Sequence, residues 1–165
     1  MTLSLDDLLT LDVEASSYNN DDSYPVSIGI AGAGAQTWYR LVCPLEDWCD
    51  WDPVAEVMHG IERETAITHG RDAFLVAREM NAMLQGRTLL VDSPWDIRWM
   101  AKLFDDVGVK MAFKIELFDS HFSSATTAEV YAKIESLEWP HVANEDAALL
   151  RKILCKQVVD AGLPG

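Results

Sequence analysis

The chain has 165 residues, of which 49% are apolar, and a formal net charge of −14. This length suits one domain over residues 1–165, and the apolar content excludes a disordered chain. Proteins that bind long nucleic acids usually do so through a basic surface, and the negative charge of this chain argues against such a surface.

The sequence has no apolar stretch of about 18 residues that could span a bilayer, and no basic segment followed by an apolar run at its start. We therefore expect a cytoplasmic protein with no membrane partner. The three cysteines form no C-x-x-C pair, and their odd number argues against a disulfide framework or a zinc knuckle.

The first part of the chain shows the alternating apolar pattern of strands. Three such segments are separated by turn residues, and they comprise residues 8–15, 25–31 and 36–43. Because the connections are short, the pattern predicts an antiparallel meander.

The rest of the chain alternates between helical and strand patterns. Apolar residues at helical spacing predict helices over residues 71–86, 94–108, 126–135 and 145–162. Strands are predicted over residues 87–91 and 109–118. Strands that alternate with helices indicate an α/β sheet covered by helices.

Asp12 and Glu14 stand two positions apart in the first predicted strand. Side chains at this spacing point to the same face, so the two carboxylates are neighbours. Two close anions repel, and a divalent cation is their natural compensation. Oxygen ligands without a nearby cysteine favour Mg²⁺ or Mn²⁺, although an ordinary solvated strand face explains the same pattern.

Three later residues are candidates for the same site. Asp96 opens a helix just after a buried strand, a place where α/β sheets present side chains, and Asp92 competes with it. His141 lies in a predicted loop, and Asp146 follows in the first turn of the last helix. Each acid alone could be a helix-start residue, so the information lies in the combination.

The order of these motifs resembles the DEDDh exonucleases, a superfamily of 3′-to-5′ nucleases. "LDVEASS" is similar to the first family motif, "VDSPWD" stands in the place of the second, and "HVANEDA" is similar to the third. The "MHGI" segment at residues 58–61 matches a sequence that commonly lies between the first two motifs. Asp92 and Ser93 depart from the usual His-Asn of the second motif.

The resemblance implies a single exonuclease domain with a ribonuclease H-like α/β fold. Its mixed central sheet would have three antiparallel first strands and helices on both faces. It further implies two divalent metal ions, Mg²⁺ or Mn²⁺, held by four carboxylates, with a histidine as general base. The metal ligands would be Asp12, Glu14, Asp96 and Asp146, and the base His141.

The resemblance also implies a slot for the 3′-terminal nucleotide, lined by the backbone of Ala15 and Ser16 and by the side chains of His59 and Ile61. The implied activity is release of mononucleotides from 3′ ends of DNA or RNA, and the negative charge favours short or single-stranded ends. Family members of this size often pair as homodimers.

Other interpretations of the sequence remain. The fold could serve as a catalytically inactive binding or assembly module, although every expected acid and the histidine are present. The "GAGAQT" segment lacks the third glycine of a dinucleotide loop, and a hairpin turn accounts for it. The spacing of Cys43, Cys49, His59 and His69 is unlike that of zinc fingers.

Overall fold

The computed structural model describes residues 4–18 and 20–160. Six strands form one mixed sheet in the order β4-β3-β2-β1-β5-β6. The strands are β1 Leu9–Ala15, β2 Pro25–Ala31, β3 Thr37–Cys43, β4 Arg71–Asp72, β5 Thr88–Val91 and β6 Lys114–Leu117. The first three strands pair antiparallel, whereas β5 and β6 run parallel to β1. The predicted sheet is confirmed, and β1 lies at its centre.

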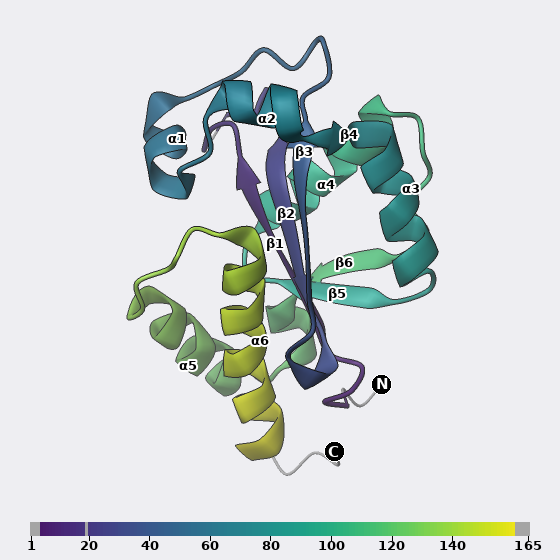
Figure 1. Ribbon diagram of the computed structural model, residues 1–165. Coiled ribbons are helices and arrows are strands. Elements are labelled where there is room, and N and C mark those ends of the chain that lie inside the picture. Colours follow the sequence, from purple (N-terminus) through teal and green to yellow (C-terminus); the bar gives the residue numbers. More distant parts are fainter. Residues whose placement is uncertain (1–3, 19, 161–165) are drawn as a thin grey trace.

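Helices cover both faces of this sheet, as predicted (Figure 1). Helices α5 and α6 lie on one side and α3 and α4 on the other, while α1 and α2 lie near the carboxyl end of β1. The helices are α1 Pro53–His59, α2 Arg63–His69, α3 Ala73–Leu84, α4 Pro94–Asp106, α5 Ser124–Glu135 and α6 Ala143–Asp160, with short 3₁₀ turns η1 Ala33–Ala35 and η2 Phe118–His121.

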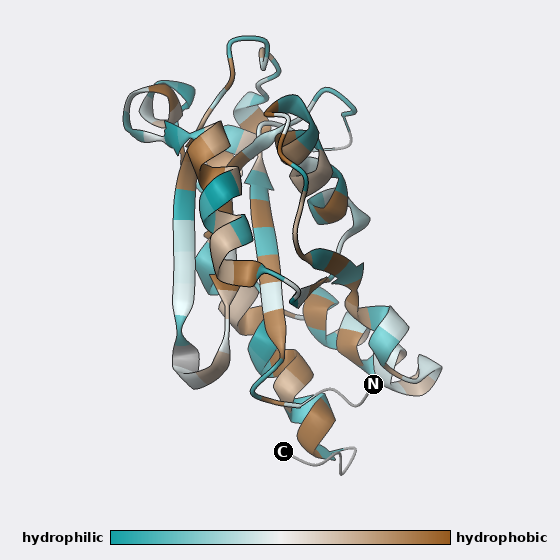
Figure 2. Ribbon diagram, turned by 90° about the vertical axis from the view of Figure 1, so that its right-hand side faces the viewer, coloured by the Kyte–Doolittle hydropathy of each residue, from teal (hydrophilic) through white to brown (hydrophobic). Residues whose placement is uncertain are grey.

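The alternating side chains of β1 separate a large core from a polar face. Leu11 and Val13 belong to the main core with α3 and α4. A smaller apolar cluster joins α5 and α6 to the start of β1 and to β5. Figure 2 shows apolar and polar segments alternating within single helices and strands, as expected of elements with one buried side. Asp12 and Glu14 lie on the β1 face that meets α6.

A glycine in the middle of β2 lets the first turn of α6 rest directly on the sheet. Gly29 pairs with Asp12 across the β1–β2 ladder. A β-carbon on Gly29 would lie 2.1 Å from the carbonyl carbon of Ala143 and 2.1 Å from the amide nitrogen of Asn144. Any side chain at position 29 would therefore push α6 away from β1.

Three short elements escaped the sequence prediction: α1, α2 and β4. Each has seven residues or fewer, which gives hydrophobic periodicity too little length to emerge. The strand predicted over residues 109–118 is shorter, with only Lys114–Leu117 in the sheet. Asn19 of the first predicted turn and residues 161–162 of the last predicted helix lie outside the described residues.

Membrane-spanning helices are not found in the described part of the chain, where every helix is too short or too polar to cross the hydrocarbon layer.

Replacing Gly29 with alanine should displace the start of α6. We expect Gly29→Ala to lower the free energy of unfolding by about 1–3 kcal/mol, the usual cost of forcing an extra methyl into a packed site. The measurement is urea unfolding followed by circular dichroism. Gly32→Ala is the control, because its methyl would meet only the Leu9 side chain, at 3.2 Å. Equal stability of the two variants would contradict this account.

Candidate active site

The five residues expected to act together line one cavity of about 230 Å³. They come from three separate parts of the chain: the end of β1, the start of α4, and the loop and first turn of α6. The residues are Asp12, Glu14, Asp96, His141 and Asp146. Asp92, the competing candidate of the second motif, lines the same cavity.

Asp96 lies beside β1 at the point where β1 and β5 separate. The β1–β5 pairing is limited to Leu9 with Leu89 and Thr10 with Leu90, so the edge of β1 is unpaired beyond that point. Asp96 fills the gap, because its Oδ1 accepts a hydrogen bond of 3.1 Å from the backbone N–H of Val13. The carboxylate thus lies between Asp12 and Glu14 along the strand, at the crevice where α/β sheets present functional groups.

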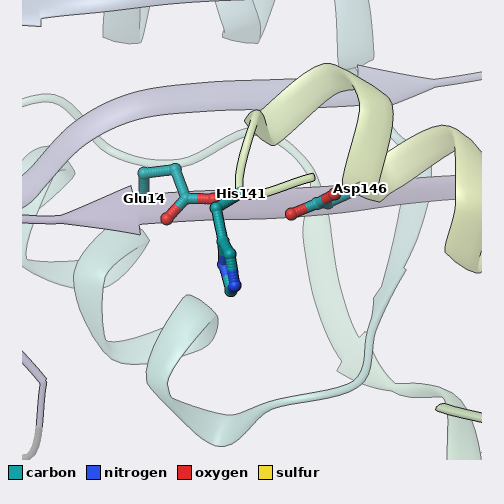
Figure 3. A group of neighbouring side chains, drawn as sticks. All are labelled: Glu14, His141 and Asp146. Atoms are coloured by element: carbon teal, nitrogen blue, oxygen red, sulfur yellow. The ribbon is translucent and has the colours of Figure 1, made fainter. Parts of the chain in front are cut away.

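The start of α6 brings the other two residues to the same strand. The hydroxyl of Thr10 donates a hydrogen bond of 2.6 Å to the backbone carbonyl of Ala147, which ties the helix to β1. Ligand atoms of Glu14, His141 and Asp146 all lie within 4.8 Å of one another. Figure 3 shows these three side chains converging from the strand, the loop and the helix. His141 has a φ of 55°, so the loop turns sharply there.

Burial raises the pKa of every expected metal-ligand carboxyl group in this cluster, and repulsion by neighbouring carboxylates adds to the shift for Asp12, Asp96 and Asp146. Desolvation is the largest cause for Asp12, followed by the charges of Asp96, Glu14 and Asp146. Burial and the charge of Asp92 raise the pKa of Asp96, and burial and Glu14 raise that of Asp146 to about 7. For Glu14, burial outweighs the opposing effects of the Tyr18 hydroxyl and His141. The cluster therefore takes up protons or cations readily.

Two buried oxygens indicate what the cluster lacks. Asp12 Oδ2 and Asp146 Oδ1 are both buried and have no hydrogen-bond partner among the described residues. A buried carboxylate oxygen without a donor destabilises the folded state, because it has lost its hydrogen bonds to water and has formed no others. Oxygen-rich sites of this kind suit hard divalent cations such as Mg²⁺ or Mn²⁺. The residues present thus fit the implied metal ions.

The residues expected to contact substrate through their backbone lie at the end of β1. Ala15 is buried, and the strand register shifts between Glu14 and Ala15. Ser16 donates its N–H to Tyr24, and its carbonyl accepts from Asp52. Its hydroxyl donates to Asp50 at 2.7 Å. Both polar groups of the Ser16 backbone are therefore engaged within the protein, and a substrate contact there stays a prediction.

His59 and Ile61 lie close to the cavity, although neither lines it. His59 ends α1, and its Nδ1 accepts the backbone N–H of Ile61 at 3.0 Å. Its Nε2 is buried without a partner among the described residues, and burial lowers the pKa of the ring. Met58, the preceding residue, does line the cavity. The substrate roles predicted for His59 and Ile61 remain proposals.

Aromatic side chains complete the cavity wall, and Trp139 among them was not predicted from the sequence. Tyr18 donates a hydrogen bond of 3.1 Å to Glu14 Oε2, so its hydroxyl holds one of the acids in place. Trp139 lines the cavity together with Trp95 and Trp99. A signal for Trp139 was available, since it lies two residues before His141.

Comparison with known proteins places this geometry in a familiar fold. No model of a known protein family matches the sequence, and neither does any curated protein. Solved structures do match. Escherichia coli exonuclease I in a zinc-bound complex with single-stranded DNA has a TM-score of 0.66 at 12% identity, over 93% of this chain and 40% of that one. The fold is the ribonuclease H-like fold of the exonucleases.

A second exonuclease supports the same conclusion. A 3′-exonuclease, described for 3′-end-specific recognition of the histone mRNA stem-loop, has a TM-score of 0.71 at 14% identity, over 96% of this chain and 65% of that one. This chain thus spans less than two thirds of either neighbour. The fold predicted from the motifs is confirmed.

The raised pKa values predict that the metal-free protein loses stability as the pH rises. The folded state holds protons on these carboxyls that the unfolded state releases near pH 4, so stability falls between about pH 4 and the pKa of Asp146, about 7. Urea unfolding in EDTA should give a lower midpoint at pH 8 than at pH 5. Asp146→Asn should flatten this dependence, and an unchanged slope in that variant would contradict the assignment.

Proposed function

We propose that this protein is a metal-dependent 3′-5′ exonuclease of the DEDDh type. The observation that carries the proposal is the convergence of the four expected carboxylates and one imidazole, from three separate parts of the chain, on one cavity. Two of the carboxylate oxygens there are buried without a partner among the described residues. The exonuclease fold supports the same activity.

Asp12, Glu14, Asp96 and Asp146 would hold two divalent ions. Bound there, such ions neutralise the scissile phosphate and stabilise the attacking and leaving oxygens of phosphodiester hydrolysis. The protein contributes rigid support for these ligands. Val13 and Tyr18 donate hydrogen bonds to two of them, which orients the carboxylates before substrate arrives.

His141 would act as the general base. A ring nitrogen lies within 4.8 Å of carboxylate oxygens of Glu14 and Asp146, so it is beside two of the proposed metal ligands. Histidine is the side chain that most often serves as a general base, because a neutral imidazole nitrogen can accept a proton. His141 would remove the proton from the attacking water.

The expected substrate is the end of a nucleic-acid strand, and we expect few contacts along the rest of that strand. Among the described residues, the cavity wall contains no Lys or Arg. The chain as a whole carries 27 acidic and 13 basic residues. Phosphate contacts by basic side chains supply most nonspecific affinity for nucleic acids. A site without them suits a short or single-stranded 3′ end, where metal ions supply the positive charge.

Labelled oligomers test the activity directly. Single-stranded DNA and RNA carrying a label at the 5′ or 3′ end should lose mononucleotides from the 3′ end in Mn²⁺ and remain intact in EDTA. A 3′ label would be released at once as a mononucleotide, whereas a 5′ label would appear in a ladder of shortening products. Binding of the oligomers without any hydrolysis would instead support an inactive binding module.

Two variants separate the proposed roles. Asp12→Asn should abolish both hydrolysis and the rise in melting temperature on adding Mn²⁺, because a ligand is lost. His141→Ala should lower kcat by about 100-fold or more, the usual contribution of a general base, and should keep the Mn²⁺-dependent rise. Differential scanning fluorimetry and single-turnover kinetics are the measurements. Equal loss of the Mn²⁺ effect in both variants would refute this division.

A further inference from the structure

Three tryptophans line the cavity, and two of them already have partners within the protein. Trp99 is buried, and its indole N–H donates to the Ser23 hydroxyl at 2.7 Å. The guanidinium of Arg98 lies 4.4 Å from the centre of the Trp95 ring, and the Trp95 and Trp99 rings are 5.8 Å apart. These contacts make Trp95 and Trp99 part of the supporting wall.

Trp139 is held differently. Its indole N–H donates a hydrogen bond of 3.1 Å to the backbone carbonyl of Ile134 at the end of α5, which satisfies its polar edge. The side chain is half-buried and packs against the apolar cluster of α5 and α6. Among the described residues, no aromatic ring or cation stacks on it. Its ring is thus fixed in position and still lines the cavity, two residues before His141.

The cavity offers little that could read the edge of a base. Among the described residues that line it, none is Lys, Arg, Asn or Gln, the side chains that most often bind base edges. The Tyr18 hydroxyl is engaged with Glu14, and the Ser93 hydroxyl accepts the backbone N–H of Trp95. Aromatic stacking, in contrast, accepts every base, because each base has a π face.

We propose that Trp139 is the stacking platform for the base of the 3′-terminal nucleotide, and that the site therefore accepts all bases alike. This inference rests on the proposed exonuclease function and specifies how its substrate is held. Because Trp139 and His141 share one short loop, stacking would also set the distance between the terminal nucleotide and the general base.

The test is isothermal titration with nucleoside 5′-monophosphates in Mg²⁺, since these would be reaction products and would not be consumed. Wild-type protein should bind AMP, CMP, GMP and UMP within about tenfold of one another. Trp139→Ala should weaken their binding by about 10-fold or more, in line with the usual effect of losing a stacked base. Ribose 5-phosphate, which has no base, should bind wild-type and variant protein equally.

Two further variants guard against an indirect effect. Trp139→Phe should recover most of the nucleotide affinity, because it restores an aromatic face. Trp38→Ala, which removes a tryptophan on β3 that is hydrogen-bonded to Glu79, should bind like the wild type. If Trp139→Ala lost affinity for ribose 5-phosphate as much as for the nucleoside monophosphates, the stacking role would be refuted. Trp139 would then be a structural support.

Failure of this inference can be told apart from failure of the proposed function. A wild-type protein that binds no monophosphate, or that binds one base more than tenfold better than the others, overturns the platform. The labelled-oligomer assay alone decides the exonuclease activity, whichever result the titration gives.

Discussion

Repulsion between carboxylates confined to one cavity is the constraint on which the site depends. At the effective dielectric of a partly buried position, two unit negative charges about 4 Å apart repel by about 4 kcal/mol. The cavity collects several such groups, and burial adds to the cost for each. Burial first, and then this repulsion, raise the pKa values of Asp12, Asp96 and Asp146. A fold tolerates such an arrangement where protons or divalent cations compensate it.

The scaffold must be rigid to hold these groups together. The central position of β1 supplies that rigidity, since strands flank it on both sides and helices cover both faces. Gly29 lets α6 approach the sheet, and the Thr10 hydroxyl binds the helix backbone. The hydrogen bond from Val13 to Asp96 joins α4 to the same strand. These contacts take no part in the proposed reaction, but they determine where the side chains of the site meet.

The cavity also explains how an acidic chain could act on an anionic substrate. Its wall combines the carboxylates with aromatic and apolar side chains, Tyr18, Trp95 and Trp139 among them. Divalent ions would offset the negative charge of the carboxylates and place positive charge next to the phosphate, while rings would hold the base. Affinity obtained in this way needs no extended basic surface, and it limits the contact to the end of a strand.

The sequence by itself determined much of the sheet and the identity of the acids. The alternation over residues 8–43 and the helical spacing from residue 71 predicted the main elements, because burial on one side imposes a period on the residues. The D-x-E spacing predicted that Asp12 and Glu14 share a face. Asp96, His141 and Asp146 were identified through a resemblance of motifs, since spacing within a chain says nothing about distances between its elements.

Only the tertiary structure decided how these parts converge. Local patterns carry no information on Gly29 beneath α6 or on the hydrogen bond between Val13 and Asp96. These contacts join residues far apart in the chain, and they form when whole helices pack on the sheet. The same packing removes water from the carboxylates, and their raised pKa values follow from that burial and from their convergence.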